Sequence, residues 1–279
     1  MEEGFKTVQS TEEAHGFMAS LNQVERETLL HIDKAWASAC RAILDGEICP
    51  VRELEGYLTR YGEPCHAEKS AISGKPVTVF GNYPKGTRFL LDEEMPQYME
   101  RAAKAKLDIN SIKDIDSASQ ALSEITMYAG NIVLGKSGYT ARSTRIVDST
   151  FVYQSSDVIY SKYVAYTQIA KYAESVFGCA SAGKHTAFAI ASAETFEANR
   201  IFECYYLYSS SDCAYSANLE NCQECMFSFN LRGKRRCIGN LELPREKYSA
   251  LRAKLLSEAR SDLKEKHSAP SIFDIIAGK

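Results

Sequence analysis

The stretch IVDSTFVYQSSDVIYSKYVAYTQIA, residues 146–170, carries an aliphatic residue at every sixth position. The series continues beyond this stretch, and its members are Ile146, Val152, Val158, Val164, Ala170, Val176, Ala182 and Phe188. After Phe188 the phase slips, and Ile190, Phe196, Phe202 and Tyr208 take over. Neither a helix nor an isolated strand has a period of six, so the pattern indicates a repeat architecture.

A second series has a spacing of nine residues and occurs in two runs, Asp148 and Asp157, and then Glu194, Glu203, Asp212 and Asn221. Six and nine share the multiple eighteen, and residues at that separation are mostly alike, as in the pairs Ile146/Val164 and Cys204/Cys222. A β-solenoid stacks equivalent side chains of successive coils, which preserves such a repeat. We therefore predict a parallel β-solenoid of about 18 residues per coil, with either three faces of six residues or two faces of nine.

The composition of residues 146–229 supports strands. Proline is absent between Pro96 and Pro244, and 16 of the 29 aromatic residues of the chain fall within this segment. Aromatic and β-branched residues favour strands over helices. At eighteen residues per coil, the segment would form between four and five coils.

The flanking segments differ from this repeat. Residues 1–145 predict a mixed α+β domain with a helix over 22–44, which Asn22 caps, and strands at 76–81 and 87–91. Residues 230–279 predict a basic loop, a helix that begins at Pro244, and a tail. Because an open solenoid end exposes unpaired strand edges, we expect that helix to cap the last coil.

Length, charge and cysteine content exclude several protein classes. The chain has 279 residues, with 33 Lys and Arg against 36 Asp and Glu, so it is not a polycation. No apolar run approaches the ~20 residues of a spanning helix, and the polar N-terminus is unlike a signal peptide. Nine cysteines are an odd number in a chain without an export signal. We therefore expect a cytoplasmic protein with reduced thiols and no membrane contact.

The cysteines near the end of the repeat suggest two alternatives. Cys222 and Cys225 form a single C-x2-C motif, and Cys204 and Cys237 lie near it, so a zinc site would use Cys204, Cys222, Cys225 and Cys237. There is no second C-x2-C and no nearby histidine. A coil of eighteen residues would stack Cys204 on Cys222, and the sequence favours a buried ladder over the zinc site.

One catalytic candidate follows from the six-residue series, which is similar to that of the left-handed parallel β-helices of acyltransferases. That resemblance implies trimers and a histidine general base, and His185 is the one histidine within 146–229. The residue after each repeat position is usually small in those enzymes, but here Tyr153 and Ile159 occupy it. A second motif, Gly130–Ser137, matches the P-loop string G-x4-G-K-S, but its apolar middle and the poor helix former after it predict a linker.

A basic segment follows the repeat and contains Arg232, Lys234, Arg235 and Arg236. Residues 230–266 carry eleven bases against five acids, a net charge of +6, while residues 146–229 carry nine acids against four bases, a net charge of −5. The segment is a candidate for binding nucleic acid or a ribonucleoprotein. Alternatives are a solvated face of the capping helix and self-association between the acidic and basic parts.

The motifs Asn221–Cys225, Asn230–Lys234, Ile238–Asn240 and Glu246–Tyr248 resemble the C-terminal signature of uncharacterised prokaryotic Cys- and Tyr-rich repeat proteins. The resemblance covers about residues 146–260; it implies a solenoid with a cap and carries no established activity. Because no catalytic constellation emerges, the sequence favours a non-catalytic scaffold that binds a protein partner or a larger assembly through the solenoid face and the basic cap. An acyltransferase-like enzyme and a zinc-binding protein are the alternatives.

Overall fold

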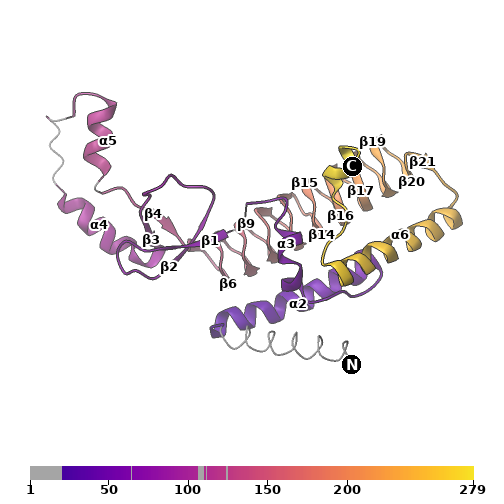
Figure 1. The fold of residues 1–279 in the computed structure, drawn as a ribbon, viewed down its shortest axis with the longest axis horizontal. Coiled ribbons are helices and arrows are strands. Elements are labelled where there is room, and N and C mark those ends of the chain that lie inside the picture. Colours follow the sequence, from indigo (N-terminus) through magenta and orange to yellow (C-terminus); the bar gives the residue numbers. More distant parts are fainter. Residues whose placement is uncertain (1–20, 64, 106–109, 111, 124) are drawn as a thin grey trace.

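The computed structural model describes residues 21–63, 65–105, 110, 112–123 and 125–279. The polar N-terminal stretch considered above lies outside these residues. Figure 1 shows an elongated molecule in which a long parallel β-solenoid is flanked by two long helices and carries a small α/β region at one end. The predicted fold class, an α+β region followed by a parallel β-solenoid and a C-terminal helix, is confirmed.

Helix α2 (Gln23–Leu44) confirms the predicted helix and its cap. The Glu25 backbone N–H donates to Asn22 Oδ1 at 2.9 Å, and the Asn22 N–H donates to Glu25 Oε2 at 3.1 Å. This reciprocal pair satisfies two N–H groups that a helix start leaves without partners. The helix ends at Asp45, and the chain continues through a 3₁₀ turn, η1 (Val51–Leu54), into the short helix α3 (Glu55–Leu58).

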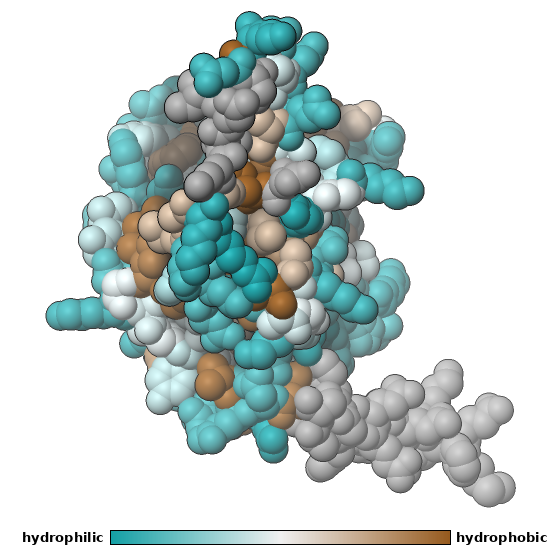
Figure 2. Space-filling model, turned by 90° about the vertical axis from the view of Figure 1, so that its left-hand side faces the viewer, coloured by the Kyte–Doolittle hydropathy of each residue, from teal (hydrophilic) through white to brown (hydrophobic). Residues whose placement is uncertain are grey.

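The small α/β region follows. Strand β1 (Cys65–Lys69) pairs antiparallel with β2 (Pro76–Phe80), and β3 (Phe89–Leu91) pairs parallel with β4 (Tyr128–Gly130). The predicted strands 76–81 and 87–91 therefore exist, but each pairs with another partner. Between β3 and β4 lie η2 (Asp92–Glu94), α4 (Met95–Lys104) and α5 (Ile115–Ser123). Figure 2 views the molecule from the end that carries these helices, where polar residues predominate around smaller apolar patches.

The solenoid consists of two sheets joined at two corners. We name them the covered sheet and the open sheet. The covered sheet contains β6 (Gly138–Ala141), β8 (Thr150–Tyr153), β10 (Lys162–Ala165), β12 (Glu174–Phe177), β14 (Ala187–Ile190), β18 (Gln223–Met226) and β20 (Arg235–Ile238). The open sheet contains β5 (Val133–Leu134), β7 (Thr144–Val147), β9 (Ser156–Ile159), β11 (Ile169–Lys171), β13 (Ser181–Gly183), β15 (Ala193–Phe196) and β19 (Phe229–Arg232). Strands β16 (Asn199–Tyr208) and β17 (Ser211–Glu220) turn a corner and contribute to both sheets, while β21 (Leu241–Glu242) pairs antiparallel with β20.

The predicted coil length of eighteen residues is wrong. Val164 pairs with Val152 on one side and Val176 on the other, so equivalent residues lie twelve apart. The solenoid has about nine turns of about twelve residues, with two six-residue faces. It extends beyond the predicted limits of 146 and 229, since β5 begins at Val133 and β20 ends at Ile238. The segment Gly130–Ser137, predicted to be a linker, contains β5, and the predicted basic loop contains β20, so both contribute strands to the solenoid.

The nine-residue spacing does not result from the stacking of equivalent residues in successive coils. Positive φ angles recur at about every third residue of the coils, and all six members of the predicted nine-residue series have them: Asp148, Asp157, Glu194, Glu203, Asp212 and Asn221. Asp and Asn tolerate this conformation better than most residues. Three steps of three place such residues nine apart, although the coil repeats after twelve.

The phase slip predicted after Phe188 marks one longer coil. Glu174 pairs with Ala187, a separation of thirteen, whereas the next coil returns to twelve with Ala187 opposite Asn199. The buried inner series accordingly passes from Ala182 to Ala189, one residue out of phase. The extra residue lies at the corner where Lys184 and His185 both have positive φ.

Small hydroxyl residues close the corners of the coils. The Ser155 hydroxyl donates to Tyr153 O at 2.8 Å and accepts the Thr167 backbone N–H at 3.1 Å. The same bond from the residue twelve positions on is accepted by Ser137, Ser143, Ser149, Ser161, Ser192, Ser210 and Ser216. At a corner the strand turns away from its neighbour, so the buried backbone N–H groups there have no partner in the β-ladder. The serine hydroxyls accept hydrogen bonds from these N–H groups instead.

Replacing Ser155 by alanine should destabilise the protein by about 1–3 kcal/mol, because the buried Thr167 N–H loses its acceptor. Urea unfolding would measure this cost, and hydrogen exchange should show faster exchange of the Thr167 amide. Ser181→Ala, at a half-exposed position of the open sheet, is the control, with an effect within about 0.5 kcal/mol. Equal effects of the two changes would contradict a structural role of the corner hydroxyl.

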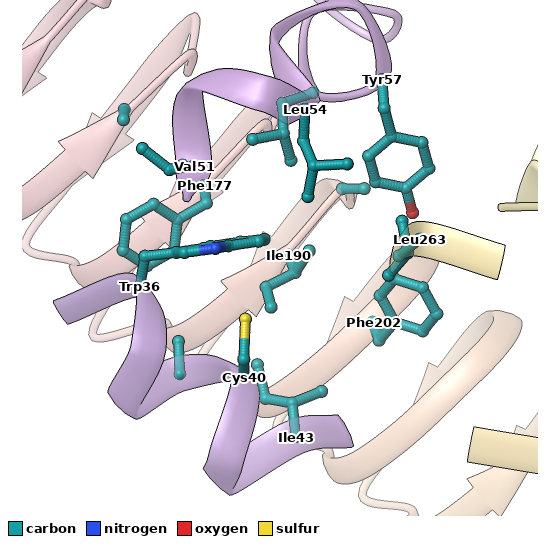
Figure 3. Packing of buried hydrophobic residues seen from close by; sticks show 14 of the residues in the cluster. Trp36, Cys40, Ile43, Val51, Leu54, Tyr57, Phe177, Ile190, Phe202 and Leu263 are labelled. Carbon is teal, nitrogen blue, oxygen red and sulfur yellow. The ribbon is translucent and has the colours of Figure 1, made fainter. Parts of the chain in front are cut away.

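The covered sheet packs against α2 and α6 (Arg245–Lys266), which follow one another along the solenoid and meet where Arg260 donates to Leu44 O at 2.8 Å (Figure 1). Figure 3 shows Trp36, Cys40 and Ile43 of α2 converging on the same core as Phe177, Ile190 and Phe202 of the sheet. The predicted C-terminal helix is confirmed, but it lies along the flank of the solenoid, where Leu256, Ala259 and Leu263 join this core. The apolar outer residues of the covered sheet explain this placement, because they need cover. The tail forms α7 (Ile272–Ile276).

Among the described residues, no helix is both long and apolar enough to cross a membrane.

Candidate functional site

The outward faces of the two sheets are geometrically equivalent but differently covered. In the covered sheet, one column is buried at every level from β6 to β18: Ala141, Tyr153, Ala165, Phe177, Ile190, Phe202, Ala214 and Met226. The residues six positions further on form the corresponding column of the open sheet: Val147, Ile159, Lys171, Gly183, Phe196, Tyr208, Glu220 and Arg232. None of these eight is buried by the described parts of the chain. We name this second column the open column.

A hollow of about 230 Å³ lies over the C-terminal half of the open column. Its apolar walls come from Phe196, Tyr206 and Tyr208. Tyr206 is 54% exposed and Tyr208 is 40% exposed. On the polar side Arg232 pairs with Glu220 at 2.7 Å, and its Nη1 donates to Asn218 O at 3.1 Å. The hollow therefore combines aromatic surface with a fixed guanidinium.

A longer groove of about 510 Å³ follows the corner beside the open sheet and contains His185. Tyr160 and Tyr172 stack along it with ring centroids 5.2 Å apart, and the His185 ring lies 6.1 Å from that of Tyr172. In the described chain the exposed imidazole has no hydrogen bond or ion pair. A general base is oriented by a hydrogen-bonding partner, so a catalytic role of His185 has no support from this geometry. The six-residue series, on which the resemblance to acyltransferases rested, belongs here to a coil of about twelve residues with two six-residue faces.

The twelve-residue coil changes the arrangement of the cysteines. Cys213, Cys225 and Cys237 stack in one inner column, while Cys204 aligns with Ser216 and therefore not with Cys222. All are buried and free, and burial raises the pKa of Cys204 to about 12. Within the described residues, the proposed ligands Cys204, Cys222, Cys225 and Cys237 do not bring three sulfur atoms within 4.8 Å of one another. Zinc binding by this set stays a prediction.

The four basic residues near the solenoid end are all ion-paired. Besides the Arg232–Glu220 pair, Arg235 Nε lies 2.9 Å from Glu224 Oε2 and Arg236 Nη1 lies 3.9 Å from the same oxygen. Lys234 Nζ lies 3.8 Å from Glu242 Oε2. These three acids offset most of the positive charge of the four basic residues. Nucleic-acid binding through the four residues stays a prediction, and a phosphate would have to compete with the carboxylates.

A buried carboxylate that the sequence analysis did not single out joins three parts of the chain. Glu203 in β16 is fully buried, and its Oε1 accepts from Tyr57 Oη at 2.5 Å and pairs with Arg60. Its Oε2 accepts from Tyr61 Oη and from the Ile272 backbone N–H at 3.0 Å. Arg60 Nη1 also donates to Ala269 O at 2.9 Å. The site thus fixes α3 and α7 to the solenoid. Its members lie far apart in the sequence, so no local motif indicated it.

This carboxylate predicts a pH dependence of stability. Burial raises the pKa of Glu203 above its ordinary 4.5, although Arg60 and the hydrogen bonds oppose the shift. A raised folded-state pKa means that folding favours the protonated form. The unfolding free energy of the wild type, relative to Glu203→Gln, should therefore fall as pH rises from about 4.5 through the folded-state pKa.

Urea unfolding of both proteins between about pH 4 and about pH 8 would measure this difference. Glu194→Gln is the control, because Glu194 is exposed and has the same backbone conformation. A wild type that gains stability over Glu203→Gln with rising pH would show that the pairing with Arg60 outweighs desolvation.

Comparisons with protein-family models, with curated proteins and with solved structures give no match to this chain. The resemblance to Cys- and Tyr-rich repeat proteins therefore stays a prediction.

Proposed function

We propose that this chain is a non-catalytic scaffold that binds a partner protein through its open sheet. The observation that carries the proposal is the contrast between the two equivalent columns. One column is buried under α2 and α6, while the described part of the chain leaves the open column uncovered, with Val147, Ile159 and Phe196 half-exposed. A partner would cover these residues as the two helices cover the other face.

The chemistry of the open sheet suits a protein more than a polyelectrolyte. Its outward residues combine the exposed Tyr206 and Tyr208 and the half-exposed Phe196 with Arg232, and aromatic residues and arginine are enriched in the cores of protein interfaces. Its charges are mixed, because Arg145 pairs with Asp157 at 2.7 Å and Arg232 with Glu220. The partner we expect therefore presents an apolar side chain to the hollow and a polar rim around it.

The stacked coils also favour binding without a large loss of conformational entropy. Backbone ladders and inner side-chain columns hold the open sheet on both edges of each strand. A surface that is already rigid loses little conformational entropy on association. The nine free cysteines agree with a reducing compartment, so a cytoplasmic partner is part of the proposal.

A site-specific photo-crosslinker tests the proposal. We would place p-benzoyl-phenylalanine at position 208 in the native host and, as a matched control, at Leu251, which is similarly exposed on α6. We expect one polypeptide to be captured at position 208 and to form a stoichiometric complex when both proteins are purified. Tyr208→Glu should weaken that complex at least about tenfold, as for an interface residue worth more than 1 kcal/mol.

Two results would change the proposal. Capture of a second copy of this chain would identify the open sheet as a homo-oligomer interface. Equal capture at positions 208 and 251, or a purified protein that carries a bound small molecule and no polypeptide, would contradict the scaffold function.

A further inference from the structure

Three potential metal ligands from distant segments converge beside the covered sheet. Cys49 lies in the connection between α2 and η1, Glu53 lies in η1, and His267 is the residue at the end of α6. One ligand atom of each residue lies within 4.8 Å of the other two, and among the described residues no other group of three does so. Glu53 and His267 are far apart in the sequence, so helix packing brings the three residues together.

The backbone around these residues is held in place. The Trp36 indole N–H donates to Cys49 O at 2.9 Å, and the Val51 N–H donates to Asp33 Oδ1 at 3.1 Å. His267 ends α6 with a φ of 51°, and its Nδ1 lies 3.1 Å from Glu53 O. A hydrogen bond from Nδ1–H to a carbonyl fixes the tautomer in which Nε2 carries the lone pair. Metal-binding histidines usually have such a partner on the second nitrogen.

We propose that Cys49, Glu53 and His267 form a zinc-binding site. A thiolate, a carboxylate and an imidazole are the ligand types that zinc accepts in tetrahedral sites, and the thiolate disfavours magnesium and calcium. With three protein ligands, the fourth position takes water. Bond lengths of about 2.0–2.3 Å require ligand atoms roughly 3.5 Å apart. The ligand atoms would therefore have to approach one another by up to about an ångström, and the exposed Glu53 carboxylate can rotate to do so.

The site is separate from the solenoid cysteines and has a structural consequence. It joins the end of α6 to the connection after α2, so a bound ion would cross-link the two helices that cover the sheet. Because Glu53 and His267 are exposed, the ion would exchange with solvent. A ligand that binds only the folded state stabilises it in proportion to ligand concentration.

Cobalt(II) titration of the full-length chain, followed by zinc displacement, tests the site. We expect one equivalent of cobalt with a sulfur-to-cobalt charge-transfer band and tetrahedral visible absorption, and displacement of both by zinc. Cys49→Ser should abolish the charge-transfer band. His267→Asn should weaken cobalt binding at least about tenfold, and asparagine tolerates the positive φ at this helix end.

The control is the double variant Cys204→Ser/Cys222→Ser. Both positions are solenoid corners, where serine occurs naturally at Ser192, Ser210 and Ser216, so the fold should be retained. This variant should bind cobalt like the wild type, and zinc should raise the unfolding temperature of both proteins but not of Cys49→Ser. No cobalt band in the folded wild type, or a band that survives Cys49→Ser, would overturn the proposal, and loss of that band in the double variant would assign it to the solenoid cysteines.

Discussion

Glu203→Ala is expected to lower the unfolding free energy by about 3–5 kcal/mol, the range for removing one partner of a buried ion pair. The change leaves the Arg60 guanidinium without its carboxylate, in a side chain of which only 20% is exposed. It also removes the acceptor of the Tyr57 and Tyr61 hydroxyls and of the Ile272 N–H. Urea unfolding at neutral pH would measure the loss.

Glu194→Ala is the matched control, because Glu194 is exposed, lies nine residues before Glu203 and has nearly the same φ, 53° against 52°. Its effect should stay within about 0.5 kcal/mol. Glu203 holds the residues before α7 in place. Glu203→Ala should therefore also speed proteolytic cleavage of the segment that follows residue 268, while Glu194→Ala should not. Similar losses in the two variants would mean that the backbone conformation, and not the carboxylate, determines stability at these positions.

Phe177→Ala should have a comparably large effect, about 3–5 kcal/mol, because it removes a fully buried ring from the interface between the covered sheet and α2. The Phe177 ring packs edge-on against Trp36 with centroids 5.2 Å apart. Trp36 is the single tryptophan of the chain. Its fluorescence therefore reports both unfolding in urea and any solvent entry at this interface, which should shift the emission to longer wavelength.

Phe196→Ala provides the control on the open sheet, where the equivalent ring is half-exposed. We expect a loss below about 1.5 kcal/mol, since full burial of such a side chain is worth about 1.5–3 kcal/mol. The Trp36 emission should not change. If Phe196→Ala cost as much as Phe177→Ala, the open sheet would be covered in the folded protein.

Local patterns predicted the elements that local forces form. The spacing from Leu29 to Ile43 and the Asn22 cap predicted α2 to within a residue, because an amphipathic face and a capping box act over a few positions. The six-residue series likewise identified the inner columns of the solenoid, since an inward position must be apolar at each face.

The predicted coil length was wrong because the six-residue and nine-residue spacings were both interpreted as the result of stacked coils. Only the six-residue spacing reports faces, while the nine-residue spacing reports a backbone conformation that recurs every third residue. Pairs at a separation of twelve carried the correct signal, as in Ser143/Ser155, Tyr160/Tyr172 and Cys213/Cys225. The single extra residue near His185 then shifted the phase and obscured the repeat.

The sequence by itself determined that residues beyond 146 stack as a parallel solenoid, because inward side chains and corner hydroxyls repeat along the chain. Tertiary structure alone decided which sheet is covered, since Phe177 and Phe196 occupy equivalent outward positions and only the packing of α2 and α6 distinguishes them. It also brought Glu203 to Arg60 and His267 to Cys49. Side chains more than a hundred residues apart meet through helix docking, and no local periodicity records that contact.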